Sequence, residues 1–507
     1  MIPEVQRETA AFLERLADKP PVETHISAVF IGPQRAWKLK KAVLLPFLNF
    51  STPVRRRHFV MHEFEINHAM APELYLAARG IARLPNGALQ FCAAEASEAI
   101  EWVLEMQTIP ADDFLDKVAA RGALTPALCG ALGDMAARLH EVTRVVQNSD
   151  EMKRAQGLID ELVRNGPSAG LERAAVEHWH AGAQVQLRAN MTLLKTRALA
   201  GHVRRGHGDL HLGNLCLWHG TVLPTDALEF DEALATIDTG YDLAFLLMDI
   251  ETRAGRTAAN TVFNRYMARS GDFTLLPMLP LWLSQRAMIR AYVLALRKHP
   301  EYKTYLRAAL GYLHPPAAPV IAIGGFQGTG KTTLARALAP ALGPAPGALV
   351  LRSDELRKRL HAVLPETRLP QEAYSPQANA ALNAALREAT TKIATSAHGL
   401  IIDASFLDLA LRADVEQLVR DAGRSWLGLW LEAPMPILID RLKHRQGDAS
   451  DAGPEVLRNA TRHNLGPITW HRLDATDKTR LLDDALTLIW PDRKLHQNQK
   501  PPGTTDL

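Results

Sequence analysis

One stretch decides the fold of the C-terminal third of this 507-residue chain: Gly325-Phe326-Gln327-Gly328-Thr329-Gly330-Lys331-Thr332. Its spacing, G-x-x-x-x-G-K-[ST], is that of a loop that cradles phosphate. Glycines let the backbone turn sharply, and successive N–H groups then point at an anion from a helix N-terminus. Lys331 adds a mobile positive charge, and the Thr332 hydroxyl can hold Mg²⁺. An apolar run precedes the loop and a helical pattern starts at Thr333, so we predict a strand–loop–helix unit that binds ATP through residues 325–333.

Strand and helix patterns alternate after this loop, which predicts a parallel sheet covered by helices. The expected strands are 320–324, 348–352, 400–403, 426–431 and 468–473. Ligands bind at the carboxyl ends of the strands in such sheets. Asp403 ends a buried strand there, and we predict that it helps to bind Mg²⁺.

Two further residues follow the second predicted strand. Asp354 is a candidate catalytic acid that takes the proton of an acceptor hydroxyl, and Arg357, three residues on, is a candidate for holding the substrate. The alternative for Asp354 is an acid that only stabilises the N-terminus of a helix.

Arg441 and Arg445 lie one helical turn apart, ahead of the small and polar run 447–453. Two arginines on one face can clamp phosphate oxygens, and we predict that both bind ATP from a mobile lid. The alternative is a solvated helix face.

A second stretch with chemical potential lies earlier in the chain: His207-Gly208-Asp209-Leu210-His211-Leu212-Gly213-Asn214, with Asp226 following it. Phosphoryl transfer needs a carboxylate at the acceptor hydroxyl and oxygen ligands that hold Mg²⁺ on the phosphates. We predict that Asp209 is the catalytic base and that Asn214 and Asp226 bind the metal.

The region before this stretch predicts a small β-rich lobe followed by helices. Residues 25–40 read as a hairpin that turns at Gly32, and alternation places Lys38 and Lys40 on the same face of its second strand. The other expected elements are a helix over 4–18, a helix over 52–71 that contains Glu63, strands over 88–92 and 101–107, and largely helical segments over 112–199 and 256–312.

His207 to Asn214 together with Asp226 resembles the catalytic segment of aminoglycoside phosphotransferases and related small-molecule kinases, which share the protein-kinase-like fold. The resemblance covers roughly residues 20–300. It implies that Lys38 contacts the ATP phosphates, with Lys40 as the open alternative, and that Glu63 pairs with this lysine. It also implies a hinge beside adenine over 101–106 and a structural acid at Asp242. No glycine-rich loop precedes the hairpin.

The C-terminal region resembles the P-loop kinases of the zeta-toxin, gluconate-kinase and polynucleotide-kinase group. The two regions in this order resemble the bifunctional aminoglycoside phosphotransferase/ATP-binding proteins of bacteria. The resemblance implies a two-domain protein, with an N-terminal α+β protein-kinase-like fold and a C-terminal α/β P-loop NTPase fold. We predict a kinase domain over 1–312, a Pro-rich linker over 313–319, a P-loop domain over 320–493 and a polar tail over 494–507.

Charge, cysteine content and the length of apolar runs limit the partners and the cellular location that we expect. The net charge is +3 and the basic clusters are scattered, so nucleic acid is possible but is not the favoured partner. The three cysteines fit neither a zinc site nor a disulfide framework, and we found neither a signal-peptide core nor an apolar run of membrane-spanning length, which predicts a cytoplasmic protein.

We therefore predict an ATP-dependent phosphotransferase with two ATP sites, which uses ATP and Mg²⁺ and a small-molecule hydroxyl acceptor. One alternative is a polynucleotide 5′-hydroxyl kinase in the C-terminal domain. Another is a regulatory protein in which one domain only senses ATP. The sequence leaves the acceptor, the coupling between sites and the oligomeric state open.

Overall fold

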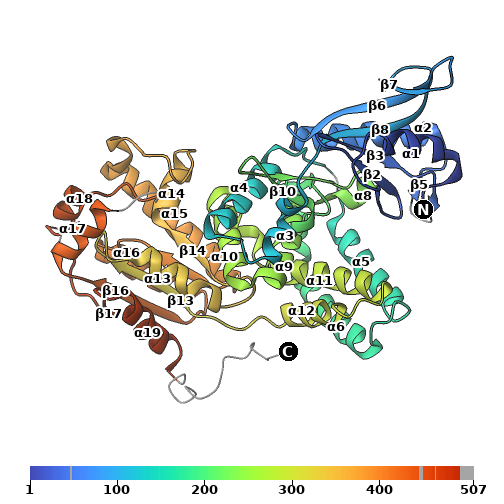
Figure 1. Ribbon diagram of the computed structural model, residues 1–507. Helices are drawn as coiled ribbons and strands as arrows, with labels where there is room; N and C mark the ends of the chain where they lie inside the picture. Colours follow the sequence, from blue (N-terminus) through green and yellow to red (C-terminus); the bar gives the residue numbers. More distant parts are fainter. Residues whose placement is uncertain (46–47, 148, 445–448, 463, 492–507) are drawn as a thin grey trace. The chain divides into compact units, whose positions relative to one another are not determined.

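The computed structural model describes residues 1–45, 48–147, 149–444, 449–462 and 464–491. Contacts divide the chain into two compact units (Figure 1). The first unit holds residues 1–125, 138–151 and 195–253, and the second holds 126–137, 152–194 and the chain from 254 onward. These units do not coincide with the predicted domains, because the helices after residue 254 group with the P-loop sheet. The Pro-rich segment has neither helix nor strand over 315–319, and the predicted domain limits stay a prediction.

The first unit begins with a six-stranded antiparallel sheet in the order β1-β2-β3-β8-β6-β7. The predicted hairpin is β2–β3, which turns at Gly32. The elements of this part of the first unit are η1 (Glu4–Gln6), α1 (Arg7–Glu14), β1 (Val22–Glu23), β2 (Ser27–Ile31), β3 (Arg35–Lys40), β4 (Leu44–Leu45), β5 (Leu48–Asn49), α2 (Pro53–Met70), β6 (Tyr75–Arg83), β7 (Leu89–Ala93) and β8 (Ala99–Gln107).

Helix α2 covers one face of this sheet and carries Glu63. It starts where Thr52 caps it, with Pro53 in the first turn, a position that proline suits because its missing N–H has no partner there. Val60 packs with Trp102 and Leu104 of β8 in one buried cluster. This packing fixes the face of α2 that looks at β3, and thereby the direction of Glu63.

The rest of the first unit carries the second motif. Two small hairpin-like pairs, β10–β11 and β9–β12, hold the motif loops over the buried helix α9. The elements are η2 (Ala111–Asp113), α3 (Leu115–Ala120), β9 (Val203–Arg205), η3 (Leu212–Asn214), β10 (Leu215–Trp218), β11 (Thr221–Pro224), α8 (Glu232–Ala235), β12 (Thr236–Asp238) and α9 (Thr239–Ala254).

The second unit contains a five-stranded sheet in the order β14-β15-β13-β16-β17, and every strand pair is parallel. Its strands agree with the five predicted ones to within a few residues: β13 (Val320–Gly325), β14 (Leu349–Arg352), β15 (Leu400–Asp403), β16 (Trp426–Glu432) and β17 (His471–Asp474). Helices α13 (Lys331–Leu338) and α19 (Lys478–Ile489) pack on one face, where Leu334, Leu338 and Leu481 join the buried cluster of Ile321 and Ile401.

Other helices of the C-terminal region are η5 (Ala339–Ala341), α14 (Ser353–Leu360), η6 (Gln371–Tyr374), α15 (Pro376–Thr395), α16 (Leu409–Asp421), α17 (Met435–Lys443) and α18 (Pro454–Ala460). The preceding helical region consists of α4 (Pro126–Val142), α5 (Glu151–Asn165), α6 (Arg173–Ala189), α7 (Met191–Leu199), α10 (Arg256–Ser270), η4 (Phe273–Leu275), α11 (Leu279–Leu296) and α12 (Tyr302–Tyr312). In the part of the chain that the structure describes, we find no helix that is long and apolar enough to cross a membrane.

Helix α10 closes the free edge of the parallel sheet. Strand β14 is the outermost strand, so its outer backbone groups have no neighbouring strand. Asn264 Oδ1 accepts a hydrogen bond from the Val350 N–H at 2.7 Å, and Asn260 Nδ2 donates to the Ala348 carbonyl at 3.0 Å. Two asparagines one helical turn apart thus take the place of a sixth strand.

Candidate functional sites

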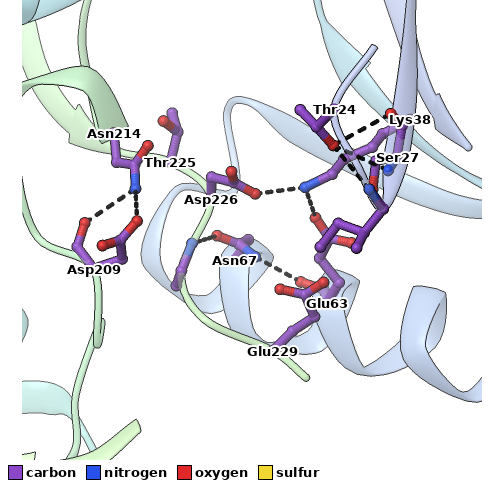
Figure 2. Close-up of polar contacts among 12 residues, drawn as sticks. Thr24, Ser27, Lys38, Glu63, Asn67, Asp209, Asn214, Thr225, Asp226 and Glu229 are labelled. Atoms are coloured by element: carbon purple, nitrogen blue, oxygen red, sulfur yellow. Dashed lines mark hydrogen bonds and ion pairs between the residues drawn. The ribbon is translucent and has the colours of Figure 1, made fainter. Parts of the chain in front are cut away.

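The predicted base and the first metal ligand of the N-terminal site lie together. Asp209 precedes η3, and Asn214 ends it. Asn214 Nδ2 donates to Asp209 Oδ2 at 2.9 Å and to the Asp209 carbonyl at 3.0 Å, which leaves the amide oxygen of Asn214 pointing away from Asp209 (Figure 2). The Asp209 side chain remains 43% exposed, so an acceptor can reach it.

The loop that carries Asp209 is fixed by Asp242 in the first turn of α9. Asp242 is fully buried and accepts hydrogen bonds from the backbone N–H groups of His207, at 2.8 Å, and of Gly208, at 3.2 Å. Gly208 has a φ of 83°, which glycine takes without strain. His207 Nε2 bonds to the Thr225 carbonyl at 3.0 Å, so it ties this loop to the segment before Asp226. Asp242 therefore holds the Asp209 loop, and the role that the resemblance implies, capping its own helix, stays a prediction.

Asp226 is held by its backbone while its carboxylate stays exposed. Its φ is 57°, a left-handed conformation that is uncommon for residues other than glycine. The Asp226 N–H donates to Tyr75 Oη at 2.7 Å, and the next N–H, of Ala227, donates to Asn67 Oδ1 at 2.9 Å. Burial and the charge of Asp226 raise the pKa of Tyr75, so the phenol keeps its proton. This anchoring aims Asp226 toward Lys38 (Figure 2).

Lys38 joins the predicted acids of this site. Its Nζ lies 2.6 Å from Glu63 Oε1 and 2.5 Å from Asp226 Oδ1. Burial lowers the pKa of Lys38, but Asp226 and Glu63 outweigh it and raise that pKa well above its usual value. Burial likewise raises the pKa of Glu63, and the charges of Lys38 and Lys40 lower it to about 2. Lysine and acid are both charged at neutral pH.

Lys40 is placed differently from Lys38. Its side chain has no exposed surface, and its Nζ lies 2.6 Å from Glu63 Oε2 and also pairs with Glu229 Oε1. A buried ammonium group cannot reach a nucleotide, so the geometry favours Lys38 in the open choice between the two lysines. Glu229 was missed by sequence reasoning, because no local signal links it to a lysine 189 residues earlier.

One expectation for the N-terminal site needs correction. Residues 101–106 lie inside β8, between β3 and β6, and Glu101 is buried in an ion pair with Arg56 at 2.7 Å. A strand in mid-sheet cannot be a hinge, so the connection starts after Gln107. In the β1–β2 turn, Thr24 Oγ1 accepts a hydrogen bond from the Ser27 N–H at 3.0 Å (Figure 2).

The P-loop connects β13 to α13 as predicted. Gly325 has a φ of 135°, and a Cβ there would come within 2.5 Å of the Leu431 carbonyl oxygen, so a larger residue does not fit. Lys331 Nζ donates to the carbonyls of Gly325 and Phe326, both at 2.9 Å. Through these bonds, the side chain of Lys331, the first residue of α13, folds back over the preceding loop.

The predicted metal ligands of the P-loop site are in direct contact. Thr332 Oγ1 donates to Asp403 Oδ2 at 2.5 Å, and Asp403 is buried at the end of β15. A hydroxyl and a carboxylate oxygen are the hard ligands that Mg²⁺ prefers, and this ion needs few protein ligands when phosphates supply the others. Arg352 Nε also approaches Asp403 Oδ2 at 3.3 Å, which holds the carboxylate in place.

Asp354 is half-buried at the start of α14, close enough to the other groups of this site to be influenced by them. Burial raises the pKa of Asp354; Arg352 and Lys331 act in the opposite direction, and the charge of Asp403 raises it further. The same carboxylate accepts a hydrogen bond from Ser450. The structure therefore brings Asp354 into the electrostatic field of Lys331 and Asp403.

Arg357 holds a neighbouring segment of the protein. It is 8% exposed, and its guanidinium donates to the Ala373 carbonyl at 2.6 Å and to Asn379 Oδ1 at 2.7 Å. It also lies over the Tyr374 ring, 4.7 Å from the centroid. These contacts fix η6 and the start of α15, and a direct contact with substrate stays a prediction.

Of the two arginines predicted to clamp phosphate, the structure describes Arg441. Arg441 donates to the carbonyls of Ala475 and Thr476, both at 2.9 Å, and its NH1 lies 3.5 Å from the Gly328 carbonyl. Helix α17 ends at Lys443, and Arg445 lies outside the described residues. Arg441 therefore links the P-loop to the turn before α19, and phosphate binding by either arginine stays a prediction.

Parts of this chain are similar to known proteins. Residues 320–464 match a family model described as AAA domain. An uncharacterized protein of Mycobacterium tuberculosis (strain ATCC 25618 / H37Rv) is 28% identical over 487 residues, which cover 89% of this chain and 91% of that protein. An adenylyl-sulfate kinase of Myxococcus xanthus (strain DK1622) is 27% identical over 184 residues, 33% of this chain and 95% of the kinase. The GDP complex of wild-type aminoglycoside 2′-phosphotransferase-IIIa shares 12% identity, with a TM-score of 0.37, and the match covers 61% of this chain and 98% of that one.

The strand orders distinguish two different sheets. The first sheet is antiparallel and lies with α2 and the Asp209 loop in the first unit, and the second sheet is parallel and carries the P-loop. Residues 320–464, which match the AAA domain model, include the P-loop and four of the five strands of this parallel sheet.

Proposed function

We propose that the protein is an ATP-dependent phosphotransferase with two nucleotide sites, each of which passes the γ-phosphate of ATP to a hydroxyl group of a small molecule. One observation carries the proposal: each unit holds a lysine close to groups that can bind Mg²⁺. In the first unit, Lys38 Nζ lies 2.5 Å from Asp226 Oδ1. In the second unit, Thr332, which follows Lys331 in the sequence, donates to Asp403 Oδ2 at 2.5 Å. Kinase neighbours, including the adenylyl-sulfate kinase, support phosphotransfer in general.

Each site has residues for the separate tasks of transfer. Mg²⁺, when bound, neutralises the charge of the phosphates; Asn214 and Asp226 would hold it in the first site, and Thr332 and Asp403 in the second. The acceptor oxygen forms a bond to the γ-phosphorus while the bond to the departing ADP breaks. The acceptor proton goes to the Asp209 carboxylate in the first site and to Asp354 in the second.

A screen with radiolabelled ATP tests the proposal. Purified full-length protein is incubated with sugars, aminoglycosides, nucleosides and 5′-hydroxyl oligonucleotides, and the Asp209→Asn and Lys331→Ala variants assign each product to a site. Transfer to small molecules is expected. Labelling of oligonucleotides alone would favour a polynucleotide kinase, and ATP binding without transfer to any acceptor would favour a regulatory protein.

A further inference from the structure

Five charged side chains form an unbroken row beside the N-terminal site. They alternate in sign, in the order Asp226, Lys38, Glu63, Lys40, Glu229. Glu63 is shared, with Oε1 at 2.6 Å from Lys38 and Oε2 at 2.6 Å from Lys40. Figure 2 shows Glu229 beside Glu63.

The two ends of this row differ in exposure. The Asp226 side chain is 54% exposed, whereas Lys40 has no exposed surface and Glu229 is 6% exposed. Lys40 Nζ also lies 4.9 Å from the centre of the Phe50 ring, which closes off its apolar side. The outer end can therefore exchange partners with a ligand, while the inner end is shielded from water and from any nucleotide.

Nucleotide binding makes opposite demands on the two ends. On the proposed function, Lys38 turns toward phosphate and Asp226 turns toward the metal, so the direct contact between them is given up. Glu63 then shares Lys38 with the phosphates, and a buried carboxylate without a partner is costly. Lys40 remains on its other oxygen, so Glu63 stays paired throughout.

The inner end also acts on the position of Asp226. Residues 226–229 are one short loop, whose middle N–H groups are held by Asn67 and by the His207 carbonyl, at 2.9 Å each. The Glu229 side chain adds the contact that joins this loop to β3, because Lys40 lies on that strand. Removing it frees the far end of the loop from the sheet.

We infer that Glu229 and Lys40 are positioning residues: their buried ion pair holds the loop of Asp226 against β3 and keeps Glu63 paired, so that Asp226 and Lys38 are free to engage Mg·ATP. This inference rests on the proposed function of the first unit. Glu229 raises the affinity for the metal-bound nucleotide without touching it. The side chains that act directly remain Lys38 and Asp226.

Calorimetric titration of the full-length chain tests the inference, with the Lys331→Ala substitution present throughout to silence the P-loop site. Glu229→Gln should weaken binding of Mg·ATP by about 10–100-fold, the usual effect of losing a group that orients a metal ligand. Binding of ATP in EDTA, which does not depend on Asp226 as a ligand, should change by less than about twofold. Adding Lys40→Met to Glu229→Gln should weaken Mg·ATP binding further, because Lys40 also pairs with Glu63 Oε2.

A matched control lies three residues further along. Glu232 also reaches α2, through His62 Nε2 at 3.0 Å, but it is 48% exposed and does not contact Lys40. Glu232→Gln should leave both titrations unchanged. Glu229→Asp, which keeps the charge on a shorter side chain, should fall between wild type and Glu229→Gln and remains informative if Glu229→Gln unfolds.

The outcomes separate two kinds of failure. If the Lys331→Ala protein with Glu229 intact binds no Mg·ATP, the proposed nucleotide site in the first unit is wrong. If it binds Mg·ATP and the Glu229 variants bind equally well, or lose affinity for ATP equally with and without the metal, the positioning role is wrong and Glu229 only stabilises the fold.

Discussion

The predicted phosphate-binding groups of the P-loop site come from one stretch, 325–333, whereas the predicted residues of the N-terminal site, Lys38, Glu63, Asp209 and Asp226, come from four separate segments. In the first case, local geometry prepares the site: a glycine turn and a helix N-terminus place the donors together. In the second, tertiary packing does so, through anchors such as Asn67 and Tyr75. The comparison teaches that a local site tolerates distant changes, while an assembled site depends on its supports.

The largest effect is expected from removing the P-loop lysine, which tests whether the two sites are separate. Lys331→Ala in the full-length chain should abolish ATP binding at the P-loop site, because its charge is the one that meets the terminal phosphates. Calorimetry should then count one ATP per chain instead of two. Lys392→Ala, on an exposed lysine of α15 paired with Glu388, is the control and should leave two. Loss of both equivalents in Lys331→Ala would contradict separate sites.

The assembled site can be separated into its roles by two substitutions. Asp209→Asn should slow transfer by about 10²–10⁴-fold, the range for a positioned general base, with Mg·ATP affinity preserved. Asp226→Asn should instead weaken Mg·ATP binding, because a metal ligand loses its charge. Calorimetry and initial rates on both variants check this; the reverse pattern would exchange the two roles.

The corresponding acid of the P-loop site has a competing explanation. If Asp354 accepts the acceptor proton, Asp354→Asn should bind ATP normally and lose at least about 10²-fold in acceptor-dependent rate. If it only stabilises the start of α14, asparagine should change little, since the effect of a helix dipole on an acid is about 0.3–1 kcal/mol. Steady-state rates with the acceptor from the screen decide, and near-wild-type turnover would exclude catalysis by Asp354.

The smallest expected effect concerns the stability of the second unit. Burial lowers the pKa of His398 from 6.5 to about 4, and the Gly347 carbonyl opposes this only in part. The unfolded chain therefore takes up the proton first, so stability is full above pH 6.5 and is lost as pH falls toward 4. From pH 7 to pH 5 the loss should be about 2 kcal/mol.

Urea unfolding at the two pH values, followed by hydrogen exchange in β14 and α10, measures this loss. His398→Gln does not titrate in this range and should remove most of the difference between the two pH values. An equal loss in both proteins would assign the acid sensitivity to other groups.

The sequence predicted those elements whose residues form a clear local pattern of apolar runs and turns. The five parallel strands and the β2–β3 hairpin follow from apolar runs bounded by turns, and they agree with the structure. Strand β6 was missed because Tyr75–Arg83 is rich in alanine and arginine and contains Gly80, so it lacks β-branched alternation. The helix predicted over 4–18 is shorter, since regular α-helix covers only Arg7–Glu14 after a 3₁₀ turn.

The residues of the two candidate sites likewise divide into those that local sequence patterns predicted and those that only the fold brings together. Motif spacing identified Asp209, Asn214, Lys331 and Thr332, because each is defined by its neighbours in sequence. Glu229 and the edge contacts of Asn264 depend on which elements fold together, which no short pattern encodes. Alternation could place Lys38 and Lys40 on one face, but their difference in burial arises from the loop that packs over Lys40.

The asparagine contacts of α10 with β14 bear on how the protein could be shortened or recombined. A chain cut at the Pro-rich segment would keep the P-loop but leave the outer backbone groups of Ala348 and Val350 without α10. A bare edge strand pairs readily with other chains and promotes aggregation. A fragment that starts before Arg256 keeps the protective helix, so a failure of the shorter piece would reveal an exposed edge and say nothing about ATP.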